Sequence, residues 1–393
     1  IFCFYFFYFK KTKGFLTNFF WLIFAYLAAI LLAGFQTLPL IEFIRISNRI
    51  SNFSSAALYD QNLTLQNLLT LFSPNFFGSP TDGSYRFFEG PDPWEGTIFI
   101  YYTGLFFLIV SFFRYKDKLV KTFAWLMIIF FLLALGKNSP IYLIHYLPVF
   151  SSFRFPTRYL FIFVFLISFL SAYGFEIFFR RFRFNFLKFL ALSILLMEIV
   201  LFFNQFHVLM SETNLYKPPP VLFWLKEDRY LVSTLTSQYL DQIYTKYGHK
   251  KEDFYYDFAN NFMLGNIGSV YNKQSFNNKF GPQLKRYIYY YGLIEENFDK
   301  KEKNITFDKK SVNLINLAGI NYILSVYPVK NDNFKLLNKK KFNNYQIFVY
   351  KNQTSLGRMQ FFNHYYLAET FDDFKKLISE GKSNFAIVEK DKN

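Results

Sequence analysis

Long apolar runs constrain the fold of this chain more than any other feature. A helix needs about twenty apolar residues to cross the hydrocarbon core of a bilayer. A shorter run, "IFCFYFFYF" at 1–9, has the composition of the end of a further span. The sequence therefore predicts an α-helical polytopic membrane bundle over residues 1–206, with five full spans at roughly 15–35, 97–113, 119–135, 158–178 and 187–206.

The charges between these runs predict which side of the membrane each connection faces. Three short connections, at 10–13, 114–121 and 180–188, together carry eleven Lys or Arg residues and one acidic residue. Positive charge gathers on the cytoplasmic side of membrane proteins, so these connections are predicted to be cytoplasmic. The prediction is a multi-pass protein of the cell membrane with an extracytoplasmic C-terminal domain. Its predicted outer parts are the loops 36–96 and 136–157 and the domain 207–393.

The formal net charge of +16 fits this membrane interpretation. Basic residues of membrane proteins gather on cytoplasmic loops and against anionic lipid. No nucleic-acid-binding motif accompanies the charge, so we expect membrane lipid, and no nucleic acid, as a partner. Cys3 is the only cysteine, which excludes a disulfide within the chain, and the four histidines show no metal-ligand spacing.

Residues 207–393 are predicted to form a mixed α/β domain. Short runs with strand composition, such as "RYLVSTLT" and "QIFVYKN", alternate with helix-like runs. In "TFDDFKKLISEG", Thr370 has the position of an N-cap and Gly381 that of a helix stop. Because Ile1 lies inside an apolar run and the chain stops at "AIVEKDKN", we also expect a fragment that lacks sequence at both ends.

Two arginines, Arg154 and Arg158, lie one helical turn apart where the fourth apolar run begins. The predicted topology places them on the outer side, against the usual bias of positive charge. Pro156 favours a helix that begins near 157, so Arg158 would lie beside free backbone N–H groups. A bound phosphate would explain both arginines. The alternatives are snorkelling to the membrane interface and a salt bridge to the long outer loop.

The long outer loop carries acidic residues that are candidates for chemistry. Carboxylates near a membrane surface can act as a general base or hold a divalent cation such as Mg²⁺ or Mn²⁺. A structural role, as a turn former or in a loop salt bridge, is the more common one for such residues. These weak catalytic candidates are Asp82, Glu89, Asp92 and Glu95.

Further polar residues lie at the predicted membrane edge. The spacing of Glu42, Arg45 and Arg49 lets all three share one helical face, which predicts an interfacial ion-pair helix. A histidine in the second outer loop is the only one near the arginines, and a lone interfacial histidine is usually structural. The loop and interface candidates are Gln36, Glu42, Arg49 and His145.

Several segments together resemble the YfhO-like bacterial membrane proteins in their order and spacing. The segments are "GFQTLPLIEFIRISNR", "SPNFFGSP", "WEGTIFIYYTG", "LGKNSPIYLIHYLPVFSSFRFPTRYLF" and "LSAYGFE". In the C-terminal region, "LINLAGINYILS" and "YKNQTSLGRMQFF" resemble two further stretches of that family. Gly357 stands where the family usually has proline. The resemblance covers most of the chain, from about 20 to 390.

The resemblance implies a polytopic glycosyltransferase of the GT-C type, a hexosyltransferase. Such an enzyme takes a sugar from a polyprenyl-phosphate carrier and transfers it to an extracytoplasmic acceptor, often an envelope glycopolymer. The family's key acidic residues lie in an outer loop near its N-terminus. We therefore expect the catalytic acid/base residue to be missing from this chain, and Arg154 and Arg158 to contact the phosphate of the carrier.

A non-catalytic function is the alternative. The chain would then transport lipid-linked sugars or act as a scaffold for the assembly of envelope polymer. A transporter should carry charged residues at mid-membrane. Glu198, in "ILLMEIVLFF", is the one that lies clearly within a predicted span, and it is also open to interpretation as a packing contact between helices.

Overall fold

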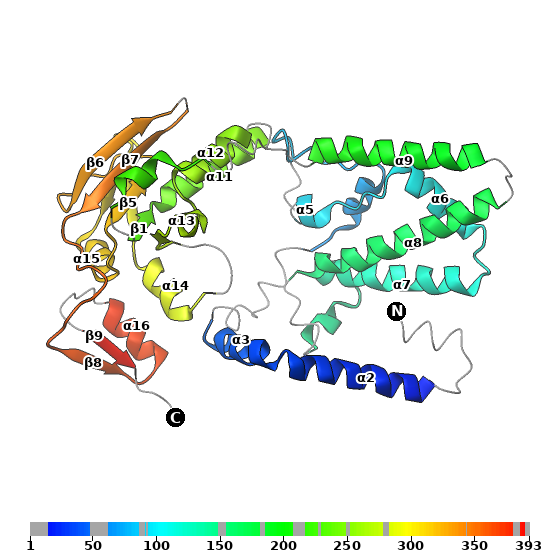
Figure 1. The fold of residues 1–393 in the computed structure, drawn as a ribbon, viewed down its shortest axis with the longest axis horizontal. Coiled ribbons are helices and arrows are strands. Elements are labelled where there is room, and N and C mark those ends of the chain that lie inside the picture. The colour runs from blue at the N-terminus through cyan, green and yellow to red at the C-terminus, as the bar shows by residue number, and fades with distance from the viewer. Residues whose placement is uncertain are drawn as a thin grey trace. The chain divides into compact units, whose positions relative to one another are not determined.

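Two compact units make up the chain (Figure 1). The first comprises Ile1–Arg45 and Arg49–Val208, and the second comprises Ile46–Asn48 and Leu209–Asn393. The division between 208 and 209 lies close to the predicted boundary at 206. The computed structural model describes residues 15–47, 62–85, 91, 93–147, 155–180, 185–206, 217–226, 229–248, 252–277, 283–342, 344–379 and 386–389.

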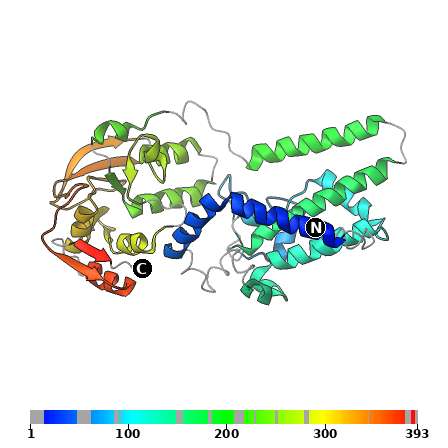
Figure 2. The same cartoon turned by 60° about the horizontal axis from the view of Figure 1, so that its bottom comes forward.

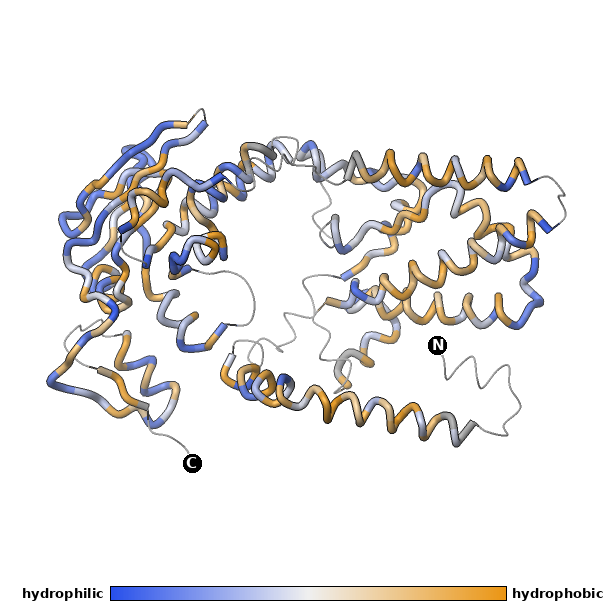
Figure 3. Tube along the Cα trace, in the orientation of Figure 1, coloured by the Kyte–Doolittle hydropathy of each residue, from blue (hydrophilic) through white to orange (hydrophobic). Residues whose placement is uncertain are grey.

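The first unit is helical. Among its described residues, α9 and the segment Pro156–Phe179 are long and apolar enough to cross a membrane, and the bent pair α2–α3 counts as a third if it forms one span. Figure 3 shows hydrophobic residues along almost the whole of α2, α8 and α9. The helices are α2 (Phe15–Leu32), α3 (Gly34–Ile46), α5 (Pro93–Gly96), α6 (Tyr102–Phe112), α7 (Lys118–Ala134), α8 (Leu160–Phe179) and α9 (Asn185–Phe206), with the 3-10 helices η2 (Leu65–Leu71), η3 (Gly136–Asn138), η4 (Tyr142–Tyr146) and η6 (Pro156–Tyr159).

Two predicted spans differ from the structure. The span expected at 97–113 is the 11-residue helix α6, preceded by non-helical backbone at 97–101. A helix of this length rises about 16 Å, whereas the hydrocarbon core is about 30 Å thick. In the non-helical backbone before α6, the N–H of Ile98 donates to the hydroxyl of Thr70 at 2.8 Å. The span expected at 15–35 bends by 74° between α2 and α3.

Helix α8 is the centre of packing in the first unit, since both α6 and α7 lie against it. Its residues Leu166 and Leu170 are fully buried. Phe123 of α7 stacks on Phe169 of α8, with ring centroids 4.6 Å apart. Gly174 of α8 faces α6 so closely that a Cβ there would collide with the backbone carbonyl of Phe107. Glycine at 174 therefore sets how near α6 and α8 approach.

The second unit is built on a five-stranded sheet with the order β2-β1-β5-β7-β6. Strands β1, β2 and β5 run parallel, while β7 runs antiparallel to both of its neighbours. Figure 2 shows that the small element of β8, α16 and β9 lies beside this sheet and does not continue it. The strands are β1 (Arg229–Val232), β2 (Gln274–Ser275), β3 (Glu296–Asp299), β4 (Asn304–Phe307), β5 (Tyr322–Ser325), β6 (Phe334–Lys341), β7 (Gln346–Asn352), β8 (Tyr365–Ala368) and β9 (Ala386–Glu389). The helices are η7 (Pro220–Trp224), α11 (Thr234–Tyr247), α12 (Glu252–Asn261), α13 (Ile267–Val270), α14 (Lys285–Gly292), α15 (Lys309–Leu317) and α16 (Phe371–Ser379).

The mixed α/β prediction for this region is confirmed, with one local error. "QIFVYKN" is β7, and Thr370 caps α16 by accepting from the N–H of Asp373 at 3.1 Å. Gly381 lies outside the described residues. "RYLVSTLT" was expected to be one strand, but the strand ends at Val232 and α11 begins at Thr234. The strand ends there because Ser233 turns the chain and a carboxylate binds the first N–H groups of the helix.

Gly319 and Gly357 form a close backbone contact after α15. Both have positive φ, +62° and +74°. A Cβ on Gly319 would collide with the carbonyl oxygen of Gly357. Proline fixes φ near −65°, so the residue usual in the resembled family does not fit the backbone observed at 357.

The carboxylate at the start of α11 belongs to Glu296. It accepts from the hydroxyl of Ser233 at 2.6 Å and from the N–H groups of Thr234 and Leu235 at 2.8 and 3.3 Å. An anion is favoured beside free N–H groups at a helix N-terminus. Burial nonetheless raises the pKa of the Glu296 carboxyl group above its ordinary value, because the charged form loses hydration.

The raised pKa of Glu296 makes the stability of the second unit depend on pH. A carboxyl group whose pKa is raised by folding contributes stability that is present below its ordinary pKa near 4.5 and is lost as pH rises through the raised value. Denaturant unfolding of the protein from about pH 4 to about pH 8 should show this loss for the second unit. Glu296→Gln should weaken the dependence, whereas Glu295→Gln, at the exposed neighbouring position, should keep it.

The contact at Gly174 predicts a stability difference between two glycines of the first unit. Gly174→Ala should lower the free energy of unfolding by about 1–3 kcal/mol, because α6 and α8 must move apart. Gly104→Ala is the matched control, since the nearest atom to a Cβ there lies 3.9 Å away in Ile100. Thermal unfolding in lipid nanodiscs measures both, and equal melting temperatures would contradict the close contact.

Candidate functional site

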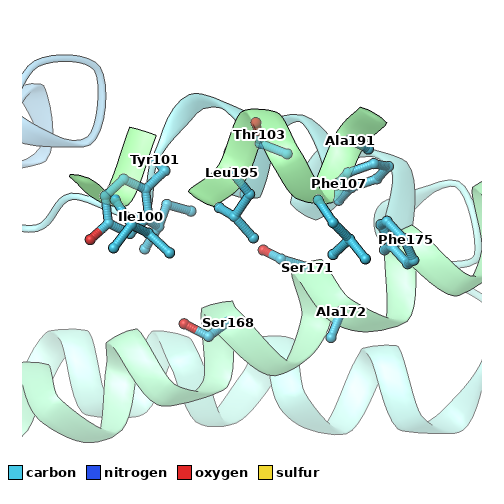
Figure 4. Close-up of a pocket in the computed structure, with 13 residues that line it drawn as sticks. Ile100, Tyr101, Thr103, Phe107, Ser168, Ser171, Ala172, Phe175, Ala191 and Leu195 are labelled. Carbon is cyan, nitrogen blue, oxygen red and sulfur yellow. The ribbon is translucent and has the colours of Figure 1, made fainter. Parts of the chain in front are cut away.

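A pocket of about 370 Å³ lies between α6, α8 and α9 in the first unit. Figure 4 shows Ile100 and Tyr101 toward one end of it, and Phe107 and Phe175 toward the other. Most of the pocket surface is apolar, and two of the three helices around it, α8 and α9, belong to the long apolar segments. The lining residues are Ile100, Tyr101, Thr103, Gly104, Phe107, Ser168, Ser171, Ala172, Phe175, Ala191, Leu192, Leu195 and Ile199.

Small residues leave the space that forms this pocket. Gly104 comes from α6, Ala172 from α8 and Ala191 from α9. The two serines of α8 contribute little polarity, because their hydroxyls donate to carbonyls of the same helix. Ser168 donates to Val164 and Ser171 to Ile167, each at 2.9 Å. The pocket therefore suits an apolar chain.

The polar part of the site is the start of α6. Tyr101 precedes the helix with φ of +62°, a conformation that non-glycine residues rarely adopt. The carboxylate of Glu198, in α9, accepts from the N–H of Thr103 at 3.1 and 3.3 Å. Free N–H groups at a helix start favour an anion. Glu198 thus fixes the start of α6 beside the pocket.

A docked segment of the long outer loop supports the same region. The side chain of Asn67 donates to the carbonyl of Gly96 at 3.2 Å, and that of Asn138 donates to the carbonyl of Leu63 at 2.9 Å. Asn62 accepts from the N–H of Lys137 at 3.0 Å. Gly136 has φ of +53°, and a Cβ there would collide with Asn62. The loop is therefore held by specific hydrogen bonds to η3 and to α5.

Arg158 lies in η6, at the start of α8, and contacts the long outer loop. Its guanidinium lies 3.6 Å from the carboxylate of Glu95 in α5, and its side chain is 59% exposed. It also lies over the ring of Phe155, 4.7 Å from the centroid. Exposed ion pairs of this kind contribute about 0–1 kcal/mol to stability. The pair joins one predicted phosphate ligand to one predicted catalytic candidate.

Of the other predicted acidic candidates, the structure describes Asp82. Asp82 forms a turn, in which it accepts from the N–H of Ser84 at 3.0 Å and from its hydroxyl at 2.5 Å. Glu89, Asp92 and Arg154 lie outside the described residues. No group of three or more His, Cys, Asp or Glu side chains that could hold a metal ion occurs in the part of the chain that the structure describes.

The predicted interface residues lie on α3 and η4. Gln36 and Glu42 are exposed on α3, and no ion pair joins Glu42 to Arg45 among the described residues. Arg49 lies outside the described residues, so the predicted ion-pair helix is described only in part. His145 lies in η4, and its side chain also lies outside the described part.

The pocket was not predicted from the sequence. Its signal is weak, because small residues in three separate apolar runs carry it and nothing in the sequence shows that they face one another. Glu198 had a clearer signal, as a charge inside an apolar run. Comparisons with family models, with curated proteins and with solved structures found no match for this chain.

The role of Glu198 predicts a local loss of stability. Glu198→Leu should lower the free energy of opening of α6 by about 1–3 kcal/mol, because Thr103 loses its partner. Hydrogen exchange at Thr103, measured in nanodiscs, reports this opening, and Glu198→Gln should restore part of the protection. Glu176→Leu is the control, since it removes an exposed pair with Arg180. Equal hydrogen exchange at Thr103 in the Glu198→Leu variant and in the parent protein would contradict the role of Glu198.

Proposed function

We propose that the chain belongs to a multi-pass membrane glycosyltransferase of the GT-C type, related to the YfhO-like proteins. It transfers a sugar from a polyprenyl-phosphate carrier to an extracytoplasmic acceptor of the cell envelope. The pocket between α6, α8 and α9 carries the proposal, because an apolar cavity among long apolar helices suits an isoprenoid chain. The topology with the second unit on the outer side belongs to the same proposal.

Arg158 is the proposed ligand of the carrier phosphate. Ser168, at the near end of the pocket, lies ten residues further along α8, which is about 15 Å of helix. An isoprenoid chain that runs along α8 would join the two places. A phosphate would compete with Glu95 for the guanidinium, and an arginine binds both anions in the same bidentate manner. Arg154 keeps its predicted role as a second ligand.

The reaction needs one carboxylate that acts as a base. The bond between the anomeric carbon and the carrier oxygen breaks, and a bond forms to the acceptor hydroxyl, whose proton goes to the base. The phosphate leaves with the electron pair, and Arg158 stabilises that charge. Glu95 is the described carboxylate nearest to Arg158, and so it is the candidate of this chain for that role.

A non-catalytic transporter or scaffold for lipid-linked sugars is the second candidate. Glu198 favours it, because a carboxylate in a long apolar helix is unusual and frequently marks the path of a substrate or ion. The two candidates share the pocket and differ in the chemical step.

The test is carrier turnover by the protein in lipid nanodiscs. With a polyprenyl-phosphate sugar and envelope polymer, the enzyme should release polyprenyl phosphate and leave sugar on the polymer. Ala172→Leu should weaken carrier binding about tenfold or more by filling the pocket with three carbon atoms. Ala25→Leu, exposed on α2, is the matched control and should leave binding unchanged. Saturable binding without release, from a folded sample, would favour the transporter or scaffold.

Variants of Arg158 and Glu95 distinguish carrier binding from the chemical step in the same assay. If Arg158 binds the phosphate, Arg158→Ala weakens carrier binding, whereas Glu95→Gln leaves binding intact and lowers turnover. If the two residues form only a structural ion pair, both variants leave carrier binding unchanged. That result would overturn the assignment of Arg158.

A further inference from the structure

The second unit contains a pocket of its own, of about 390 Å³, at the start of β1. It lies among the start of β1, helix α14, the end of α15 and the element of α16 and β9. A volume of this size suits a small ligand. All residues that line it belong to the second unit, so ligand binding in it does not depend on whether the first unit transfers a sugar.

Two arginines from different elements line this pocket, Arg229 from β1 and Arg286 from α14. The guanidinium of Arg229 is fixed, because it donates to the carbonyl of Ala318 at 2.5 Å and to the side chain of Gln274 at 3.4 Å. A guanidinium has more N–H donors than these two bonds use. None of the described residues that line the pocket is acidic. The charge of the lining therefore favours an anion.

Aromatic rings form much of the remaining lining. Tyr287 and Tyr290 of α14 pack on Phe276, with ring centroids 5.5 and 6.1 Å away. Their hydroxyls bind protein, since Tyr287 donates to the carbonyl of Phe276 and Tyr290 donates to the carbonyl of Leu314. The tyrosines consequently offer ring surface and not hydroxyls. Phe362 and Phe374 also line the pocket.

The side-chain amide of Gln360 is a polar group of the lining that can bind a ligand hydroxyl. The amide nitrogen of Gln360 donates to the carbonyls of Leu317 and Gly357 at 2.9 and 3.0 Å. These bonds orient the amide, and its oxygen can accept from a ligand. The pocket thus combines cations, ring faces and an acceptor. A pyranose that carries an acidic group matches all three, because its C–H face packs on rings, its hydroxyls donate and its anion binds guanidinium.

We propose that this pocket binds an anionic saccharide, meaning a sugar unit with a carboxylate or phosphate group. A nucleotide is disfavoured, because the usual phosphate position in such folds, the turn after a parallel strand, is filled at β1 by the Glu296 carboxylate. A fatty acid would leave the amide oxygen of Gln360 without a donor. With the outer position of the second unit that the proposed function includes, this site would hold the protein to acidic envelope polymer.

Calorimetric titration of the full chain, in nanodiscs of neutral lipid, tests the proposal. The probes are a uronic acid disaccharide, a hexose phosphate, a neutral disaccharide and inorganic phosphate. At least one of the two charged sugars should bind, and the neutral disaccharide and inorganic phosphate should bind about tenfold or more weakly. The charged sugar that binds more tightly shows whether the anionic group of the ligand is a carboxylate or a phosphate. No carrier is added, so failure of sugar transfer does not affect the result.

Variants localise the binding to the pocket. Arg286→Ala should weaken charged-sugar binding about tenfold or more, and Gln360→Leu should weaken it less. Lys335→Ala removes the same charge from exposed β6, at the opposite edge of the sheet from β2, and should leave binding unchanged. Unfolding curves that match the parent show that the variants fold. Equal binding of neutral and charged sugars, no binding, or an Arg286→Ala variant with full affinity would each overturn the proposal. The proposal would also be overturned if the protein bound anionic lipid vesicles more tightly than charged sugars and Arg286→Ala removed that binding.

Discussion

The hydrogen bonds between the Glu198 carboxylate and the backbone of Thr103 allow a helix to begin between other apolar helices. The first N–H groups of a helix have no acceptor within the helix, so a carboxylate from another helix satisfies one of them here. The late start of α6 then leaves 97–101 irregular and lets Ile98 bind Thr70 of the outer loop. The pocket next to α6 depends on the same arrangement, because Tyr101, Thr103 and Gly104 all line it.

In the second unit, too, a carboxylate from a distant segment accepts from backbone N–H groups at the start of a helix. Glu296 binds the N–H groups of the first two residues of α11, and Glu198 binds one N–H group at the start of α6. In both units the acidic residue is far from the helix in sequence, so the contact ties distant segments together. In the second unit it also occupies a position that could otherwise receive a phosphate, which leaves the pocket lined by Arg229 and Arg286 as the place that favours an anion.

Local features were predictable and distant ones were not. The apolar runs indicated α7, α8 and α9 nearly at their observed bounds, and Thr370 marked the start of α16, because composition and caps act within a few residues. The start of α6 binds Glu198 and the backbone before it binds Thr70, and both partners lie far away in the chain. Asp82, expected as a turn former or a base, lies in a turn with Ser84. A salt bridge from the arginines to the long loop was among the alternatives, and Arg158 pairs with Glu95 of that loop, although the sequence did not indicate which acidic residue.

The order of the five-stranded sheet also bears on how the second unit behaves beside other copies. Its two edges are β2 and β6. Unpaired edge strands invite pairing with another chain, and short length or lysine residues prevent it. Strand β2 has only two residues, and β6 carries Lys335, Lys339, Lys340 and Lys341. Both edges are therefore protected against strand addition by another copy of the chain.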